Sequence, residues 1–115
     1  MHAANGPSCA VAFFDGTVLH VWSHCQGTYP LRRTLANFLE MPEEKVHVKA
    51  VPGSGCFGHN GANDVATEAA LIALELPNKH IRLQWSREDE NAWEPYGTAM
   101  IVDIEASLDT NGKIA

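Results

Sequence analysis

Short apolar and alternating stretches along the chain predict β-strands with one buried face. Residues 8–14 form an apolar run, and residues 17–22 follow it after Asp15-Gly16, a dipeptide typical of a two-residue hairpin turn. Residues 46–51 and 80–85 alternate apolar and polar side chains, which is the pattern of a half-buried strand. The first two runs are therefore expected to pair as a hairpin.

Two other stretches carry apolar residues at helical spacing. Residues 30–39 begin with a proline, a favoured first helical residue, and place Leu31 and Leu35 on one side. Residues 62–76 are apolar nearly all round and rich in alanine. Such a pattern predicts a helix that is covered on most sides and that a sheet can approach closely.

The C-terminal part of the chain predicts one more strand. Residues 86–97 are charged and are expected to be irregular, whereas residues 98–108 have the pattern of a strand. Residues 109–112 are a turn signal, and residues 113–115 look like the start of a returning strand. The order ββαβαββ predicts an α+β fold in which two helices pack on a mixed β-sheet.

The unfinished last hairpin predicts that the chain is a truncated segment of a larger domain. Residues 1–115 are expected to form a single domain fragment. A strand that lacks its partner leaves an open sheet edge, which can pair with another chain. We therefore expect self-association through this edge.

Composition and charge exclude several classes of partner. The net charge of −6 and the pI near 5.4 argue against a nucleic acid or an anionic membrane, either of which favours a basic protein face. No apolar run reaches the roughly 18 residues of a membrane span, and the N-terminus lacks the layout of a signal peptide. Cys9, Cys25 and Cys56 have no paired spacing, so reduced thiols and a cytoplasmic location are expected.

Candidate chemistry concentrates in a glycine-rich loop at residues 51–61, between a predicted strand and a predicted helix. Four of the nine glycines of the chain stand within nine positions there. Glycine permits positive φ and close approach of the backbone, so the N–H groups of the loop could hold an anionic or oxo group. The alternative is a tight connection that needs glycine for its geometry alone. A single aromatic residue, Phe57, stands between Cys56 and Gly58, and a buried ring is one way to hold such a loop in a fixed shape.

Other chemistries are weaker alternatives for the same region. Cys56 and His59 have a C-x-x-H spacing, and His24-Cys25 could add two ligands for zinc, but paired ligand units are missing. Ser54 lies between two glycines, but the spacing of a nucleophile elbow is absent.

Four segments in register resemble one protein family. Residues 53–59 resemble the glycine-phenylalanine-glycine loop of the molybdopterin-binding large subunit of the xanthine dehydrogenase and aldehyde oxidase family. Residues 21–26 look like its strand that ends in a glutamine, residues 39–48 its helix-to-strand link, and residues 81–90 its later strand and arginine–glutamate segment. The resemblance covers roughly residues 6–114 and is closest to bacterial nicotinate dehydrogenase-like and isoquinoline oxidoreductase-like subunits.

The resemblance implies a cofactor-binding role for five residues. Gln26 matches the glutamine whose amide hydrogen-bonds an oxo ligand of molybdenum, and Gly55, Cys56, Phe57 and Gly58 match the loop that lines the cofactor. An amide N–H₂ is a neutral donor and can orient an oxo group without binding the metal itself. No catalytic or metal-ligating residue is expected in this chain, because the catalytic glutamate of the family lies outside it.

The implied protein is a molybdenum-dependent hydroxylase that is active only at full length. Its substrate would be an N-heteroaromatic compound or an aldehyde, hydroxylated with oxygen from water. Its cofactor would be a molybdopterin in the cytosine dinucleotide form. Its partners would be an iron–sulfur subunit or domain and a flavin subunit or cytochrome.

The chain departs from the family pattern after the loop. His59 and Asn60 stand where family members often have a glycine or arginine and then a basic residue, and Gly61 stands where purine-oxidising members have a glutamate. Purine specificity is therefore not expected. The alternative function is a small non-catalytic α+β module whose glycine loop binds an anion or a partner peptide.

Overall fold

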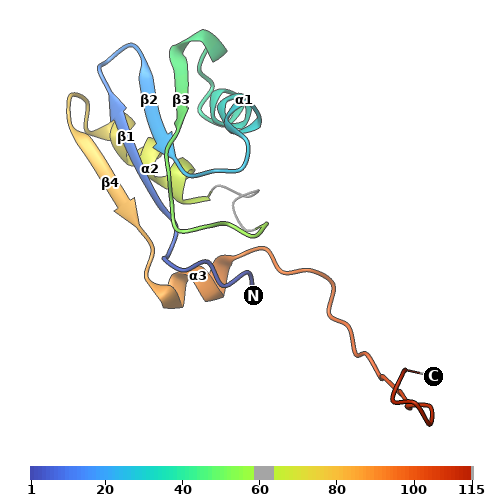
Figure 1. Ribbon diagram of the computed structural model, residues 1–115. Coiled ribbons are helices and arrows are strands. Elements are labelled where there is room, and N and C mark those ends of the chain that lie inside the picture. Colours follow the sequence, from blue (N-terminus) through green and yellow to red (C-terminus); the bar gives the residue numbers. More distant parts are fainter. Residues whose placement is uncertain (59–63, 115) are drawn as a thin grey trace.

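The computed structural model describes residues 1–58 and 64–114. A four-stranded sheet forms its centre, with the strand order β3-β2-β1-β4 (Figure 1). The strands are β1 (Cys9–Phe14), β2 (Leu19–Ser23), β3 (Val46–Ala50) and β4 (His80–Gln84). Strand β1 is antiparallel to both β2 and β4, whereas β2 and β3 are parallel, so the sheet is mixed as predicted.

The hairpin predicted at Asp15-Gly16 is present, but its turn is longer than two residues. The last pair of β1 and β2 joins Phe14 to Leu19, which leaves four residues in the connection. The Asp15 carboxylate accepts the N–H groups of Thr17 and Val18 at 2.8 and 2.7 Å. The two N–H groups therefore bond the Asp15 side chain and do not extend the backbone hydrogen bonds between β1 and β2, as a two-residue turn would require.

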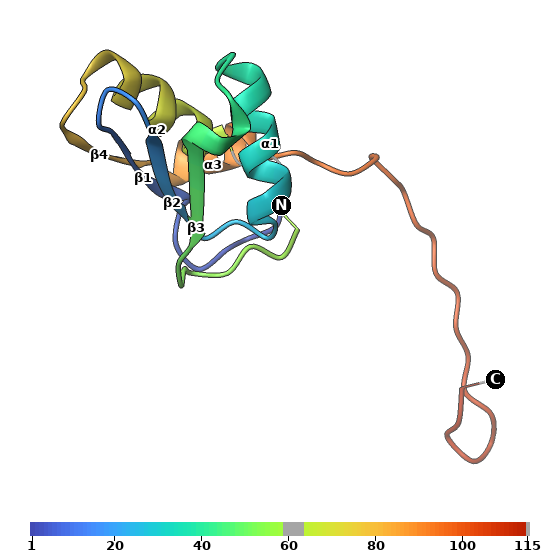
Figure 2. The same ribbon diagram turned by 90° about the horizontal axis from the view of Figure 1, so that it is seen from above.

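Helices cover one face of the sheet. Helix α1 (Thr28–Phe38) packs against β3, and α2 (Asp64–Glu75) packs against β1 and β4. Figures 1 and 2 show both helices on the same side, with the short helix η1 (Glu43–Lys45) leading into β3. The other face carries aromatic rings; Phe13 stacks on His80 with ring centroids 4.5 Å apart.

Small side chains let α2 lie close to the sheet. Its buried residues are Val65 and four alanines, and they face the alanines of β1 and the branched residues of β2. The core cluster includes Ala10, Ala12, Leu19, Val21, Val46, Ala66, Ala69, Ala70 and Ala73. The close approach of α2 to the sheet is therefore as predicted. The prediction that this helix is covered on most sides is wrong, because Leu71 and Ile72 are 42% and 40% exposed.

The C-terminal part differs from the prediction in two elements. Residues expected to be irregular form helix α3 (Arg87–Trp93), whereas residues 98–108 form no strand. A single bridge between Leu108 and Ile114 closes the predicted turn. Figures 1 and 2 show this segment projecting away from the rest of the molecule, and its Ile101 is 95% exposed.

The α+β class is confirmed, with four strands in one mixed sheet and three α-helices among the described residues. The predicted order is wrong for residues 98–108 because of strand pairing. A segment with the pattern of a strand becomes a strand only where a neighbouring strand satisfies its backbone hydrogen bonds. Across the part of the chain that the structure describes, no helix has the length and apolar character to cross a membrane.

Candidate functional site

The parallel pair β2–β3 brings the two predicted cofactor-binding segments to the same edge of the sheet. Ser23, the last residue of β2, pairs with Ala50, the last residue of β3. The Val51 N–H then donates to the Ser23 carbonyl at 3.1 Å. Since parallel strands end at one edge, the segment after β2 and the glycine loop start side by side.

His24 joins these two segments. A Cβ added to Gly53 would lie 2.4 Å from the Cβ of His24, so the backbone of the loop lies directly against this side chain. The Cys56 thiol donates to the His24 carbonyl at 3.1 Å. The Nε2 atom of His24 accepts the Cys9 N–H at 3.3 Å, which fixes the ring between β1 and the loop. Position 53 therefore requires glycine because the backbone approaches the His24 side chain too closely for a Cβ to fit.

Left-handed backbone conformations expose the main chain of the loop. Gly55, Phe57 and Gly58 have φ values of +91°, +52° and +104°. A buried Phe57 ring is not the way in which this loop is held, because the side chain is 66% exposed. Its ring folds back over Gly55, where an added Cβ would lie 2.9 Å from Cε2. Left-handed residues in short loops are one ingredient of anion-binding backbone concavities, and this loop holds three of them.

Gln26 lies in the connection between β2 and α1 with an exposed side chain. A loop residue at this place could instead cap the following helix, but Gln26 does not do so. Helix α1 begins at Thr28, its N-cap residue is Gly27, and no side chain makes a capping hydrogen bond. His59, the next residue of the family motif, lies outside the described residues.

Residues 1–8, here called the N-terminal arm, pack against the glycine loop. The sequence did not predict this contact. The Asn5 N–H donates to the Ser54 carbonyl at 3.1 Å, and the Ser54 hydroxyl donates to the Gly6 carbonyl at 2.9 Å. This second bond gives Ser54 a structural role in place of the nucleophile considered above. No sequence signal marks such a contact, because 48 positions separate its partners.

Hollows in the described part of the chain lie near these elements. One of about 280 Å³ is lined by the arm, by β1 and by the start of the loop, including Gly6, His24, Gly53 and Ser54. This hollow borders the start of the glycine loop through Gly53 and Ser54, but none of the five predicted cofactor-binding residues lines it. The candidate site is therefore the loop itself and not the hollow.

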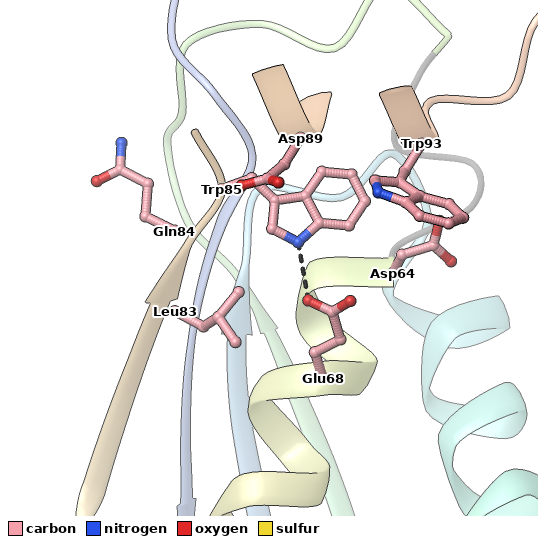
Figure 3. Close-up of a pocket in the computed structure, with 7 residues that line it drawn as sticks. All are labelled: Asp64, Glu68, Leu83, Gln84, Trp85, Asp89 and Trp93. Carbon is pink, nitrogen blue, oxygen red and sulfur yellow. Dashed lines mark hydrogen bonds between the residues drawn. The ribbon is translucent and has the colours of Figure 1, made fainter. Parts of the chain in front are cut away.

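A larger hollow of about 520 Å³ lies beside helix α2, where Figure 3 shows the indoles of Trp85 and Trp93 above Glu68 and Asp64. The Trp85 Nε1 donates to Glu68 at 2.8 Å, which joins the end of β4 to α2. None of the five predicted cofactor-binding residues lines this hollow.

The zinc alternative finds little support in the described part of the chain. The Cys56 Sγ and His24 Nδ1 atoms are 3.8 Å apart, but no group of three His, Cys, Asp or Glu residues is placed to hold a metal ion among residues 1–58 and 64–114. The cysteines Cys9, Cys25 and Cys56 form no disulfide. The described residues therefore bring together no closed metal site here, and His59, one of the ligands considered, lies outside them.

Comparison with known proteins identifies the family. The model of the molybdopterin cofactor-binding domain matches residues 1–115. The chain is 37% identical over its whole length to one of the subunits of nicotinate dehydrogenase from Pseudomonas putida, and it covers 10% of that protein.

Solved structures share the fold. Quinoline 2-oxidoreductase of Pseudomonas putida 86 has a TM-score of 0.69 and 21% identity over 77% of this chain and 12% of that chain. Aldehyde oxidoreductase of Desulfovibrio gigas has a TM-score of 0.70 and 17% identity over 76% of this chain and 10% of that chain. The chain thus spans about a tenth of the length of these relatives. It belongs to the molybdopterin cofactor-binding domain family of the xanthine dehydrogenase and aldehyde oxidoreductase type.

Proposed function

We propose that the full-length protein is a molybdenum hydroxylase and that this segment provides part of its cofactor-binding surface. The observation that carries the proposal is the glycine loop, in which Gly55, Phe57 and Gly58 hold left-handed conformations beside the end of β2. Glycine at positions 55 and 58 permits the positive φ values and the close approach of the Phe57 and His2 rings that shape the loop. This backbone fits an extended, anionic cofactor such as a molybdopterin.

Each residue has a distinct task in this proposal. The backbone N–H groups of Phe57 and Gly58 bind the cofactor, and the Gln26 amide orients an oxo group of the metal by hydrogen bonding. His24 and Cys56 hold the loop against the end of β2. When bound, the cofactor supplies the oxidation chemistry, and the protein supplies position and electrostatics.

The finer features of the enzyme belong to the same proposal. The cofactor is the cytosine dinucleotide form, and the substrate is an N-heteroaromatic compound or an aldehyde. Electrons leave through an iron–sulfur subunit or domain toward a flavin subunit or a cytochrome, in the cytoplasm. The match to a protein named as a subunit of nicotinate dehydrogenase supports an assembly of several subunits.

Metal and pterin analysis of the full-length protein, purified from its native host, tests the proposal. We expect molybdenum near one per chain and a fluorescent pterin after oxidation. Gly58→Ala should lower both, because its φ of +104° disfavours any Cβ and the new atom would lie 3.3 Å from the His2 ring.

Gly16→Ala is the matched control. Its φ of +94° imposes a similar backbone strain, but nothing lies within 4 Å of the added atom and the position is in the distant hairpin turn. Molybdenum content should therefore be unchanged in this variant. A well-folded full-length protein without molybdenum would overturn the proposal and favour a module that binds an anion or a peptide.

A further inference from the structure

The N-terminal arm lies between helix α3 and the glycine loop (Figure 1). On the loop side it bonds Ser54 twice, through the Asn5 N–H and the Gly6 carbonyl. A third contact is made by the His2 ring, since a Cβ added to Gly58 would lie 3.3 Å from both Cδ2 and Nε2 of that ring. The arm therefore contacts the loop at two residues, Ser54 and Gly58.

On the other side, two carboxylates of the α3 region hold the arm. Glu90 accepts the Ser8 N–H at 2.7 Å and the Ser8 hydroxyl at 3.3 Å. Glu94, one helical turn later, accepts the His2 N–H at 3.1 Å. The two residues are only 2% and 5% exposed, although glutamate is almost never fully buried unless it is paired.

Burial makes these contacts obligatory. A carboxylate removed from water costs free energy unless its oxygens accept hydrogen bonds, and here the arm supplies the donors. The Arg87 guanidinium adds a third tie by donating to the Asn5 carbonyl at 3.1 Å. The position of the arm, and through it the position of Ser54 and Gly58, is therefore determined by residues of α3 and its C-terminal end.

We propose that Glu90 and Glu94 are positioning residues for the glycine loop, acting through Ser8 and His2. The identity of the group that the loop holds rests on the function proposed above, but the positioning itself does not. No atom of Glu90 or Glu94 needs to touch a cofactor for this role.

The test compares Glu94→Gln with Glu88→Gln in the full-length protein. Both changes remove one negative charge from the α3 region, but Glu88 is exposed and is not among the acceptors that hold the arm. Amide hydrogen exchange of residues 53–58 is measured in the absence of cofactor, together with the global unfolding midpoint. We expect about tenfold faster exchange in Glu94→Gln, the size of one lost charge-assisted hydrogen bond, with wild-type exchange in Glu88→Gln.

A second variant, His2→Ala, keeps the test decisive if Glu94→Gln fails to fold. It removes the ring that lies against Gly58 and should therefore speed amide exchange in residues 53–58. A purely structural effect would instead lower the global unfolding midpoint without a selective change in the exchange of these residues. Loop exchange that matches the wild type in both variants would overturn the inference.

Molybdenum retention separates this inference from the proposed function. If the wild type binds no molybdenum but the variants show faster amide exchange in the loop, the positioning role is supported and the proposed hydroxylase function is rejected. A wild type that retains molybdenum, with variants that neither lose it faster nor loosen the loop, would reject the positioning role and keep the hydroxylase.

Discussion

At the residue scale, Gly53 is the described glycine of the loop at which an added Cβ would make the shortest contact. Gly53→Ala would place its Cβ 2.4 Å from His24 Cβ and 2.8 Å from Nδ1, closer than real side chains approach. The His24 ring cannot yield freely, because its Nε2 accepts the Cys9 N–H. We expect a loss of about 1–3 kcal/mol in the free energy of unfolding, measured with urea.

Gly97→Ala is the control for this prediction. Nothing lies within 4 Å of a Cβ at Gly97, and its φ is not in the left-handed region. Its unfolding free energy should stay close to that of the wild type. Equal effects of the two substitutions would contradict the close approach of Gly53 to His24.

Glu94 should make the free energy of unfolding depend on pH in the acid range. Burial, the largest influence, would raise its pKa, but the His2 N–H, the positive chain terminus and the His2 ring together lower the pKa from its ordinary value of 4.5. A carboxylate whose folded pKa is depressed stabilises the fold above its unfolded pKa and loses that contribution as the pH falls through the folded pKa. Stability should therefore decline in the acid range below pH 4.5.

The variant Glu94→Gln tests this assignment. It should be less stable than the wild type at neutral pH and should lose less stability on acidification, as followed by urea unfolding across a pH series. Glu88→Gln, at an exposed position of α3, should keep the acid-dependent decline. A wild-type slope in Glu94→Gln would rule out Glu94 as its source.

Residue identities near the loop were partly readable from the sequence. The clustering of glycines predicted unusual backbone conformations, and Gly55 and Gly58 have them. The exposure of Phe57 could not be read in the same way, because a ring beside glycines can fold over Gly55 and still face water. The roles assigned to Gln26 and to the loop in binding a cofactor remain predictions.

At the element scale, helix α3 was missed although the sequence contains its start signal. The Ser86 hydroxyl accepts the Asp89 N–H at 3.1 Å, and the Asp89 carboxylate accepts the Ser86 N–H at 3.0 Å, which is a capping box. The many charges around it suggested an irregular surface segment. Two of those charges, Glu90 and Glu94, are in fact buried against the arm.

The capping box supplies a prediction for α3. Ser86→Ala removes the acceptor for the Asp89 N–H and should cost about 0.5–2 kcal/mol of unfolding free energy, because an N-cap hydroxyl satisfies an otherwise unpaired donor. Ser107→Ala, in the exposed C-terminal segment, should cost almost nothing. Thermal unfolding of the two variants under identical conditions measures the difference, and equal midpoints would contradict the capping role.

At the scale of the whole molecule, the C-terminal segment makes the chain elongated. The radius of gyration is 19.5 Å, whereas about 13 Å is typical of a compact domain of similar size. Residues 98–108 place apolar side chains in water, including Met100, Ile101 and Ile104. This segment offers unpaired backbone groups to any strand that can reach it.

The chain is therefore expected to self-associate through residues 98–108. Light scattering over a dilution series should show a mass that rises with concentration. Ile101→Lys should shift the chain toward the monomer, because a charge on an exposed strand opposes edge-to-edge pairing. Leu76→Lys, a similar change at an exposed position beyond α2, should leave association unchanged, and a wild type that is monomeric at every concentration would contradict the prediction.

The sequence by itself determined the elements whose signals are local. Period-two and helical spacing, the Asp15-Gly16 turn and the alanine-rich helix each depend on residues that are neighbours in the chain, so they could be read in order. Only the tertiary structure decided which strands pair, that the arm lies beneath the loop, and that residues 98–108 form no strand. These outcomes depend on partners far away in sequence or absent altogether, because a backbone N–H or a buried carboxylate is satisfied by whatever group the fold places opposite it.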